Sequence, residues 1–235
     1  MSRPALKETA GCFGKVPQLG DFVSNGLPRR FVEPWDDFLR EFLAASREAL
    51  GEAWLETFLN GPIWRFALGA GLAGPDAVVG TLMPSVDRVG RYFPLTIAHL
   101  VDRVPITLDA DPWFERAEML SLETLDDAFD PATFSARLEA LGTPDLSAGE
   151  DAEFRGRWWT LGSGTLEPLT LRASILPRGQ AAAALLDGDW MRWGWDAQPI
   201  AAPVEEPTGA TEAADATDTT NAIDATDATA AALHD

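Results

Sequence analysis

Three apolar segments that follow one another closely are the feature that most restricts the fold of this chain. Apolar and polar residues alternate over residues 64–68, residues 77–83 are mostly apolar, and residues 91–101 again place large apolar side chains on one face. Such patterns are typical of β-strands. The connections between the segments are too short to contain the helix that a parallel crossover needs. The sequence therefore predicts an antiparallel meander of three strands.

Amphipathic helices are predicted before and after this meander. Residues 34–50 carry one apolar stripe with a proline and two aspartates in the first turn, and residues 54–59 form a second short amphipathic piece. An acidic residue stands directly before a proline at Asp111 and at Asp130, an arrangement that caps and starts a helix. Two further helices are therefore expected after the meander.

The remaining apolar segments predict additional strands. Residues 10–16 are expected to form a strand, and residues 18–28, which are rich in turn formers, a structured loop. Residues 155–160 and 169–175 each predict a strand, and residues 180–186 a last short helix. Helices and strands thus mix along the chain, as in an α/β domain.

The charge of the chain excludes two classes of partner. Its 37 acidic and 18 basic residues give a formal net charge of -19, and Lys and Arg form no run. Nucleic acids and anionic membranes both attract clustered basic residues, so neither is expected to bind. The single cysteine, Cys12, excludes an internal disulfide and fits a reducing compartment. Since no apolar run approaches the roughly 20 residues of a membrane helix and residues 1–9 lack a signal-peptide pattern, we expect a cytoplasmic protein without membrane insertion.

The composition changes sharply near residue 198. No Lys or Arg follows Arg192, and from residue 198 onward the chain is mostly Ala, Thr, Asp, Pro and Glu. Such a segment buries too little apolar area to offset about 1 to 2 kcal/mol of backbone entropy per residue. We expect a single folded domain over residues 1–197 and a disordered acidic tail over residues 198–235. The tail is either solvated or in contact with a basic partner.

The residue types that most catalytic sites use are scarce. The two histidines are His99, inside an apolar strand, and His234, in the tail, so neither a metal site nor a histidine-based triad is expected. Lys15 follows a glycine but does not complete a phosphate loop, because Thr9 stands where a glycine is required and Val16 where Ser or Thr would bind magnesium. We expect no cofactor, no metal and no enzymatic activity.

Two groups of polar residues remain as candidate sites. The first pairs Lys15 with Asp21, and the second, in the last connection of the meander, comprises Ser85, Asp87, Arg88 and Arg91. In a purely structural role the aspartate caps the turn, while the arginines pair with acids and cover aromatic rings. Alternatively the residues form a partner-binding surface, or a catalytic or small-ligand site.

Ordered motifs between residues 14 and 96 carry a family resemblance. They are Gly14-Lys15-Val16-Pro17, Gly20-Asp21-Phe22-Val23, Pro34-Trp35-Asp36, Pro62-Ile63-Trp64-Arg65-Phe66 and the run Met83-Pro84-Ser85-Val86-Asp87-Arg88-Val89-Gly90-Arg91, which continues to Phe93-Pro94-Leu95-Thr96. On these motifs the chain resembles the TagF family, also called ImpM, of bacterial type VI secretion accessory proteins. The resemblance marks eight residues as family-signature or partner-binding residues: Lys15, Asp21, Phe22, Ser85, Asp87, Arg88, Arg91 and Phe93.

The resemblance implies both a fold and a function. The fold would be an α/β three-layer sandwich with a mainly antiparallel central sheet flanked by helices. The function would be post-translational repression of type VI secretion through binding to the forkhead-associated scaffold protein Fha, in a pathway with a PppA-type phosphatase and a threonine kinase. The alternatives are a small-ligand or phosphoprotein-directed enzyme or sensor that uses Lys15, Asp21, Ser85 and Asp87, and a structural subunit of the secretion apparatus.

Overall fold

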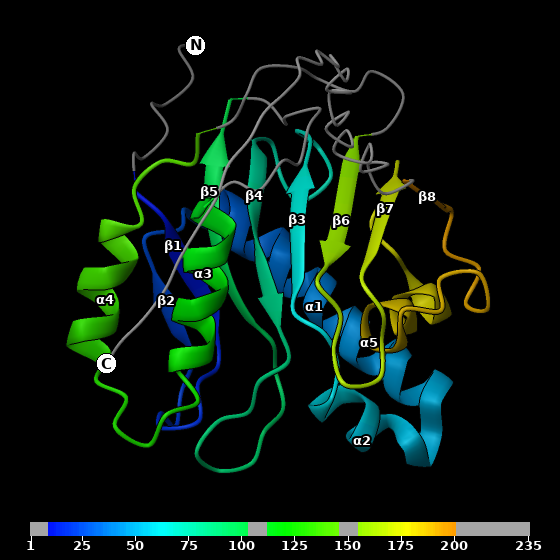
Figure 1. Cartoon of the computed structure of the whole chain (residues 1–235), viewed down its shortest axis with the longest axis horizontal. Helices are drawn as coiled ribbons and strands as arrows, with labels where there is room; N and C mark the ends of the chain where they lie inside the picture. Colours follow the sequence, from blue (N-terminus) through cyan, green and yellow to red (C-terminus); the bar gives the residue numbers. More distant parts are fainter. Residues whose placement is uncertain (1–8, 103–111, 146–154, 201–235) are drawn as a thin grey trace, which may run out of the picture. The chain divides into compact units, whose positions relative to one another are not determined.

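An eight-stranded antiparallel sheet forms the centre of the structure (Figure 1), a computed structural model that describes residues 9–102, 112–145 and 155–200. The strands lie in the order β2-β1-β5-β4-β3-β6-β7-β8. Their bounds are β1 Gly11–Gly14, β2 Val23–Asn25, β3 Trp64–Leu68, β4 Ala77–Met83, β5 Leu95–Val101, β6 Gly156–Thr160, β7 Leu169–Ala173 and β8 Ala197–Pro199.

The predicted meander is confirmed and occupies the middle of the sheet. β4 pairs with β3 on one side and with β5 on the other, both antiparallel. The last of the three strands begins at Leu95 rather than at Arg91, because residues 91–94 complete the turn that leads into it. All three strands are buried along their whole length.

Gly80 is required where the three strands of the meander lie side by side. It pairs with Phe66 in β3 and with Ala98 in β5. A Cβ at this position would lie 2.6 Å from Cζ of Phe66 and 2.4 Å from the carbonyl oxygen of Ile97. The missing side chain therefore leaves the space into which the Phe66 ring packs.

Helices cover both faces of the sheet, which confirms the three-layer sandwich (Figure 1). On one face lie α1 (Arg29–Leu50), α2 (Trp54–Leu59) and α5 (Ala184–Asp187), and on the other α3 (Pro112–Glu123) and α4 (Pro131–Ala140). Aromatic side chains such as Trp35 of α1 and Trp158 of β6 are buried between the first layer and the sheet. The second buries Trp113 and Phe114 of α3 against the opposite face. None of the helices in the described ranges is long and apolar enough to cross a bilayer.

Two local predictions near the N-terminus need correction. Helix α1 begins at Arg29, so Pro34 lies inside the helix and not in its first turn. Phe31, which is buried and stacks on Trp35 with ring centroids 5.5 Å apart, extends the helix toward the N-terminus. The expected loop over residues 18–28 contains β2, which is too short to show an alternating pattern and pairs with β1.

One of the two predicted helix caps is confirmed. The Asp130 side chain caps α4 by accepting a hydrogen bond from the Thr133 N–H, 2.8 Å away, whereas Asp111 lies outside the described residues. Cys12 is buried in β1, and burial raises the pKa of its thiol to about 12.

The ordered sheet continues beyond the expected domain boundary at residue 197. Strand β8 runs from Ala197 to Pro199 and pairs with β7, and the N–H of Ile200 donates to the carbonyl of Thr170 at 3.0 Å. Residues 201–235 lie outside the described part, so the disorder of the tail stays a prediction.

Candidate functional site

The connection between β4 and β5 is folded around one carboxylate, that of Asp87. Its Oδ1 accepts hydrogen bonds from the N–H groups of Val89 (3.0 Å) and Arg91 (2.9 Å). The N–H of Asp87 in turn donates to the Arg91 carbonyl at 3.1 Å, and Gly90 supplies the positive φ of 82° that the turn requires. Asp87 thus fixes the turn through its side chain and its backbone.

The second oxygen of Asp87 carries the ion pairs of the site. Oδ2 accepts from Nζ of Lys15 at 2.7 Å and from Nε of Arg91 at 2.6 Å. The Asp87 side chain is fully buried and that of Lys15 is 6% exposed, whereas that of Arg91 is 56% exposed. Burial by itself would raise the pKa of Asp87, but the hydrogen bonds from Lys15, Arg91 and Val89 outweigh it and hold this pKa well below its usual range. The carboxylate is therefore ionised at any physiological pH.

The loop between β1 and β2 is tied to this turn by hydrogen bonds. The Ser85 hydroxyl donates to the Lys15 carbonyl at 2.8 Å, and the N–H of Arg88 donates to the Leu19 carbonyl at 3.0 Å. Nη2 of Arg91 donates to the carbonyl of Gly20. The structure thus joins the two groups of polar residues that the sequence separates, and it pairs Lys15 with Asp87 rather than with Asp21.

Three phenylalanines close the site on one side. The rings of Phe13 and Phe22 stack with centroids 5.6 Å apart, and Phe93 meets Phe22 edge-on at 4.8 Å. Nζ of Lys15 lies 5.1 Å from the centre of the Phe22 ring, a cation–π distance. Phe93 is buried while Phe22 is 41% exposed. Of the three rings, that of Phe22 therefore lies against the Lys15 ammonium group.

The candidate residues divide into two sets according to exposure. We call Lys15, Ser85 and Asp87 the inner clamp, because they are buried and hydrogen bonded to one another or to each other's backbone. The exposed residues around it, Phe22, Arg88, Val89 and Arg91, form the outer rim. Asp21 is also exposed, and its side chain has no hydrogen bond or ion pair within the described ranges.

The inner clamp is poorly suited to acid–base chemistry. Four donors saturate the two oxygens of Asp87, and the low pKa opposes protonation. Lys15 is committed to the same carboxylate. No group of His, Cys, Asp and Glu side chains within the described ranges could hold a metal ion.

His99, the described histidine, lies apart from this chemistry. It is buried in β5, as expected, with its ring 6.4 Å from that of Trp113. Nδ1 lies 2.8 Å from the carbonyl of Leu100, but Nε2 is buried and has no hydrogen-bond partner in the structure as described. One ring nitrogen of His99 is therefore hydrogen bonded and the other is not, among the residues that the structure describes.

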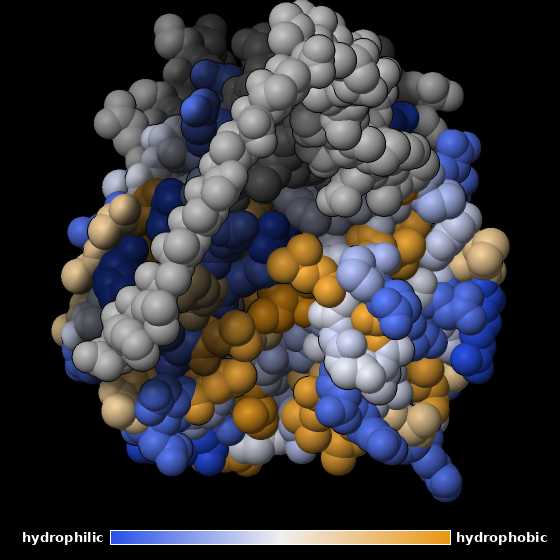
Figure 2. Space-filling view, viewed as in Figure 1, coloured by the Kyte–Doolittle hydropathy of each residue, from blue (hydrophilic) through white to orange (hydrophobic). Residues whose placement is uncertain are grey.

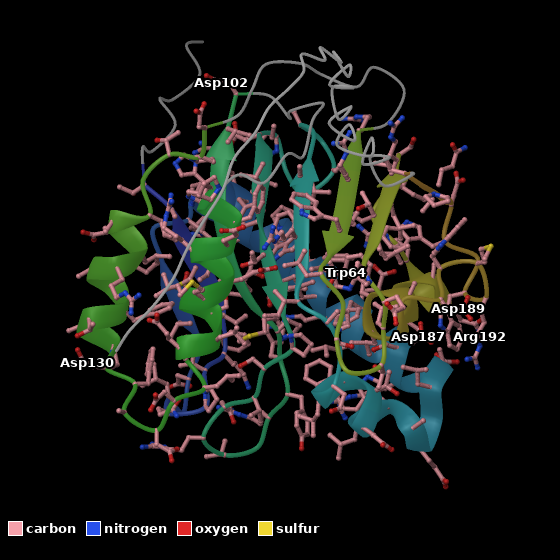
Figure 3. All side chains as sticks on the ribbon, viewed as in Figure 1. Trp64, Asp102, Asp130, Asp187, Asp189 and Arg192 are labelled. Carbon is pink, nitrogen blue, oxygen red and sulfur yellow. The ribbon has the colours of Figure 1, made fainter. Side chains whose placement is uncertain are left out.

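The sequence did not indicate two further polar clusters. Arg65 of β3 forms a two-pronged ion pair with Glu118 of α3, at 2.8 Å and 2.6 Å, which attaches this helix to the sheet. Asp187, the last residue of α5, lies near Asp189 and Arg192 of the turn that follows (Figure 3), and its Oδ2 accepts from the indole N–H of Trp193 at 2.7 Å. The sequence gives no sign of the first cluster, because Glu118 is far from Arg65 along the chain. It gives none of the second, because the aspartates stand among turn-forming residues.

An exposed apolar stripe lies on α3 and the turn that follows it. Met119 is 60% exposed, and Leu122 and Leu125 are each 49% exposed. Arg116, which is exposed and has no ion pair in the described part of the chain, stands one helical turn before Met119. Figure 2 shows hydrophobic residues gathered near the C-terminal end of this helix.

Comparisons with known proteins agree with these motifs. A family model described as the TagF N-terminal domain, type VI secretion system-associated, matches residues 11–141, a range that contains the inner clamp and the outer rim. The chain is also similar to the protein in the crystal structure of PA0076 from Pseudomonas aeruginosa PAO1, with 37% sequence identity and a TM-score of 0.68. That alignment covers 77% of this chain and 95% of the other. No curated protein matches the sequence.

Proposed function

Because this chain belongs to the TagF family of type VI secretion-associated proteins, we propose that it is a cytoplasmic repressor of type VI secretion that acts after translation. It does so by binding a forkhead-associated scaffold protein of the Fha type. A PppA-type phosphatase or a threonine kinase of the same pathway is a further candidate partner. The observation that carries the proposal is the family match over the segment that contains the clamp and the rim.

The geometry of the site supports binding rather than catalysis. An enzyme or small-ligand sensor would need Lys15, Asp21, Ser85 and Asp87 to converge with free donors or acceptors. Instead, the carboxylate of Asp87 already accepts hydrogen bonds on both oxygens, one of them from Lys15. The Ser85 hydroxyl donates to the Lys15 carbonyl, and Asp21 lies apart on the surface. The exposed outer rim on a rigid turn is what a partner-binding protein requires.

A pull-down and a secretion assay test the proposal. Purified full-length protein is expected to co-elute with the Fha-type protein encoded in the same genome, and its overexpression is expected to stop effector export. If folded protein neither co-elutes with the Fha-type protein nor blocks export, the proposed function is wrong. Stable co-purification with the assembled secretion machine, without inhibition, would favour a structural subunit.

A further inference from the structure

We propose that the outer rim is the docking surface for the partner, and that the partner presents an acidic segment with an apolar side chain beside its carboxylates. This inference rests on the proposed function, because it places the contact with the Fha-type protein on a particular surface of this chain. The inner clamp then serves to hold the rim in position.

The first observation is the charge of the rim. The guanidinium groups of Arg88 and Arg91 both lie at Gly20: Arg91 donates to its carbonyl, and a Cβ added there would lie 3.5 Å from Nη2 of Arg88. Asp87 neutralises one of these cations, and it also binds Lys15. The Arg88 side chain has no ion pair or hydrogen bond within the described ranges.

This local excess of positive charge stands in a chain with a net charge of -19. The exposed acid beside Gly20 in the sequence is Asp21, which pairs with neither arginine in the structure as described. An unpaired guanidinium on an otherwise acidic molecule favours a carboxylate ligand over a basic or neutral one. Its planar fork can bind such a carboxylate through two hydrogen bonds.

The second observation is the rigidity of the rim. The Arg88 backbone is fixed by its hydrogen bond to Leu19, and its neighbour Val89 is fixed by the Asp87 carboxylate. The turn is therefore ordered before a partner arrives, so binding has less entropy to lose. Figure 1 shows this connection extending beyond the ends of β4 and β5, where a partner can reach it.

The third observation is apolar surface beside the cations. Val89 is 66% exposed and Phe22 is 41% exposed. The lower edge of Figure 2, where the β4–β5 connection lies, shows hydrophobic and hydrophilic residues side by side. A ligand with carboxylates alone would leave these two side chains in water, which is why we expect an apolar residue in the partner segment.

Titration calorimetry with single-residue variants tests the rim. The full-length protein and its Arg88→Glu and Arg88→Gln variants are titrated with the purified Fha-type protein from the same genome. Arg88→Glu is expected to weaken binding roughly tenfold or more, and Arg88→Gln to weaken it less. Both should leave the melting temperature unchanged, because the Arg88 side chain makes no bond in the described part of the chain.

Arg116→Glu is the matched control. It reverses the charge of an exposed arginine without an ion pair, on α3 beside the apolar stripe, and is expected to bind as the wild type does. If Arg88→Glu binds as tightly as the wild type, the rim is not the docking surface although Fha binding stands. If Arg116→Glu is the weakened variant, the partner docks on α3 and the inference is overturned. If the wild type does not bind, the proposed function fails and the inference with it.

Discussion

At the scale of single residues, the site depends on a buried carboxylate with more positive than negative charge around it. Both side chains are buried, so water cannot solvate the charge of Lys15, and Asp87 neutralises it instead. A buried pair of this kind contributes little net stability, but removal of one partner leaves the other charge unpaired in a low-dielectric environment. Asp87 is therefore a residue on which the fold of the turn depends, whatever the rim binds.

We predict that Asp87→Asn lowers the free energy of unfolding by about 3 to 5 kcal/mol, because Lys15 is left as a buried unpaired cation. Chemical denaturation at neutral pH measures the change. Asp21→Asn is the control, since an exposed carboxylate without a partner in the described ranges should change stability by no more than about 0.5 kcal/mol. Equal, small effects of the two variants would show that the clamp does not stabilise the fold.

The effect of Asp87→Asn on the free energy of unfolding should depend on pH in a defined way. The pKa of Asp87 is lower in the folded chain than in the unfolded chain, so its stabilising contribution is complete above the unfolded value of about 4 and is lost as the pH falls through the folded value. The stability difference between the wild type and Asp87→Asn should therefore be constant from neutral pH to about pH 5 and narrow below about pH 4. A difference that already narrows near neutral pH would contradict the assigned ionisation.

At the scale of elements, the meander places the site by holding the ends of β4 and β5 in register. Gly80 sits midway in β4, and its missing side chain lets Phe66 lie across the strand. Ser85 and Asp87 of the inner clamp lie in the connection that leaves this strand at Met83. The close packing at Gly80 and the turn that carries Asp87 thus belong to one strand and the connection that follows it.

We predict that Gly80→Ala destabilises the protein by about 1 to 3 kcal/mol, because the new Cβ overlaps the Ile97 carbonyl and the Phe66 ring. Thermal and chemical denaturation report the loss. Gly164→Ala serves as the comparison, since a Cβ there meets no atom within 4 Å. A stability unchanged by Gly80→Ala would mean that the strands can separate without loss.

At the scale of the whole molecule, two helical layers cover the sheet, and the β4–β5 connection, where we propose that the partner binds, extends beyond its end. The family match runs from β1 to the end of α4 and contains the inner clamp and the outer rim. The segments beyond residue 141 add β6, β7 and β8 to the sheet. The proposed docking surface and the strands β6, β7 and β8 thus lie in different parts of the sequence.

We predict that a chain ending at Ile200 keeps the stability of the full-length protein, because the last described strand, β8, ends at Pro199. A chain ending at Asp196 should be less stable, since it loses Ala197, which is buried, and the pairing of β8 with β7. Calorimetry on both truncations separates the cases. Loss of stability in the longer truncate would show that the segment after Ile200 contributes to the fold.

Most of the element order could be predicted from the sequence, because it depends on local patterns. Alternation predicted β3 and β7, an apolar run predicted β4, and the helical stripe over residues 54–59 coincides with α2. Strand β2 was missed because three residues are too few to show a period. The start of α1 was placed too late because the packing of Phe31 on Trp35 extends the helix past a proline that local rules put in its first turn.

The sequence by itself determined the residue types of the site and the turn that carries them, because a proline-bounded run with Asp87 and a glycine favours a turn whatever surrounds it. Only the tertiary structure decided which residues pair and which remain exposed. Lys15 and Asp87 are 72 positions apart, and no local pattern encodes a contact over that distance. Their pairing follows from β1 lying beside β5 in the sheet, which leaves Arg88 and Arg91, and not Lys15, as the exposed cations of the site.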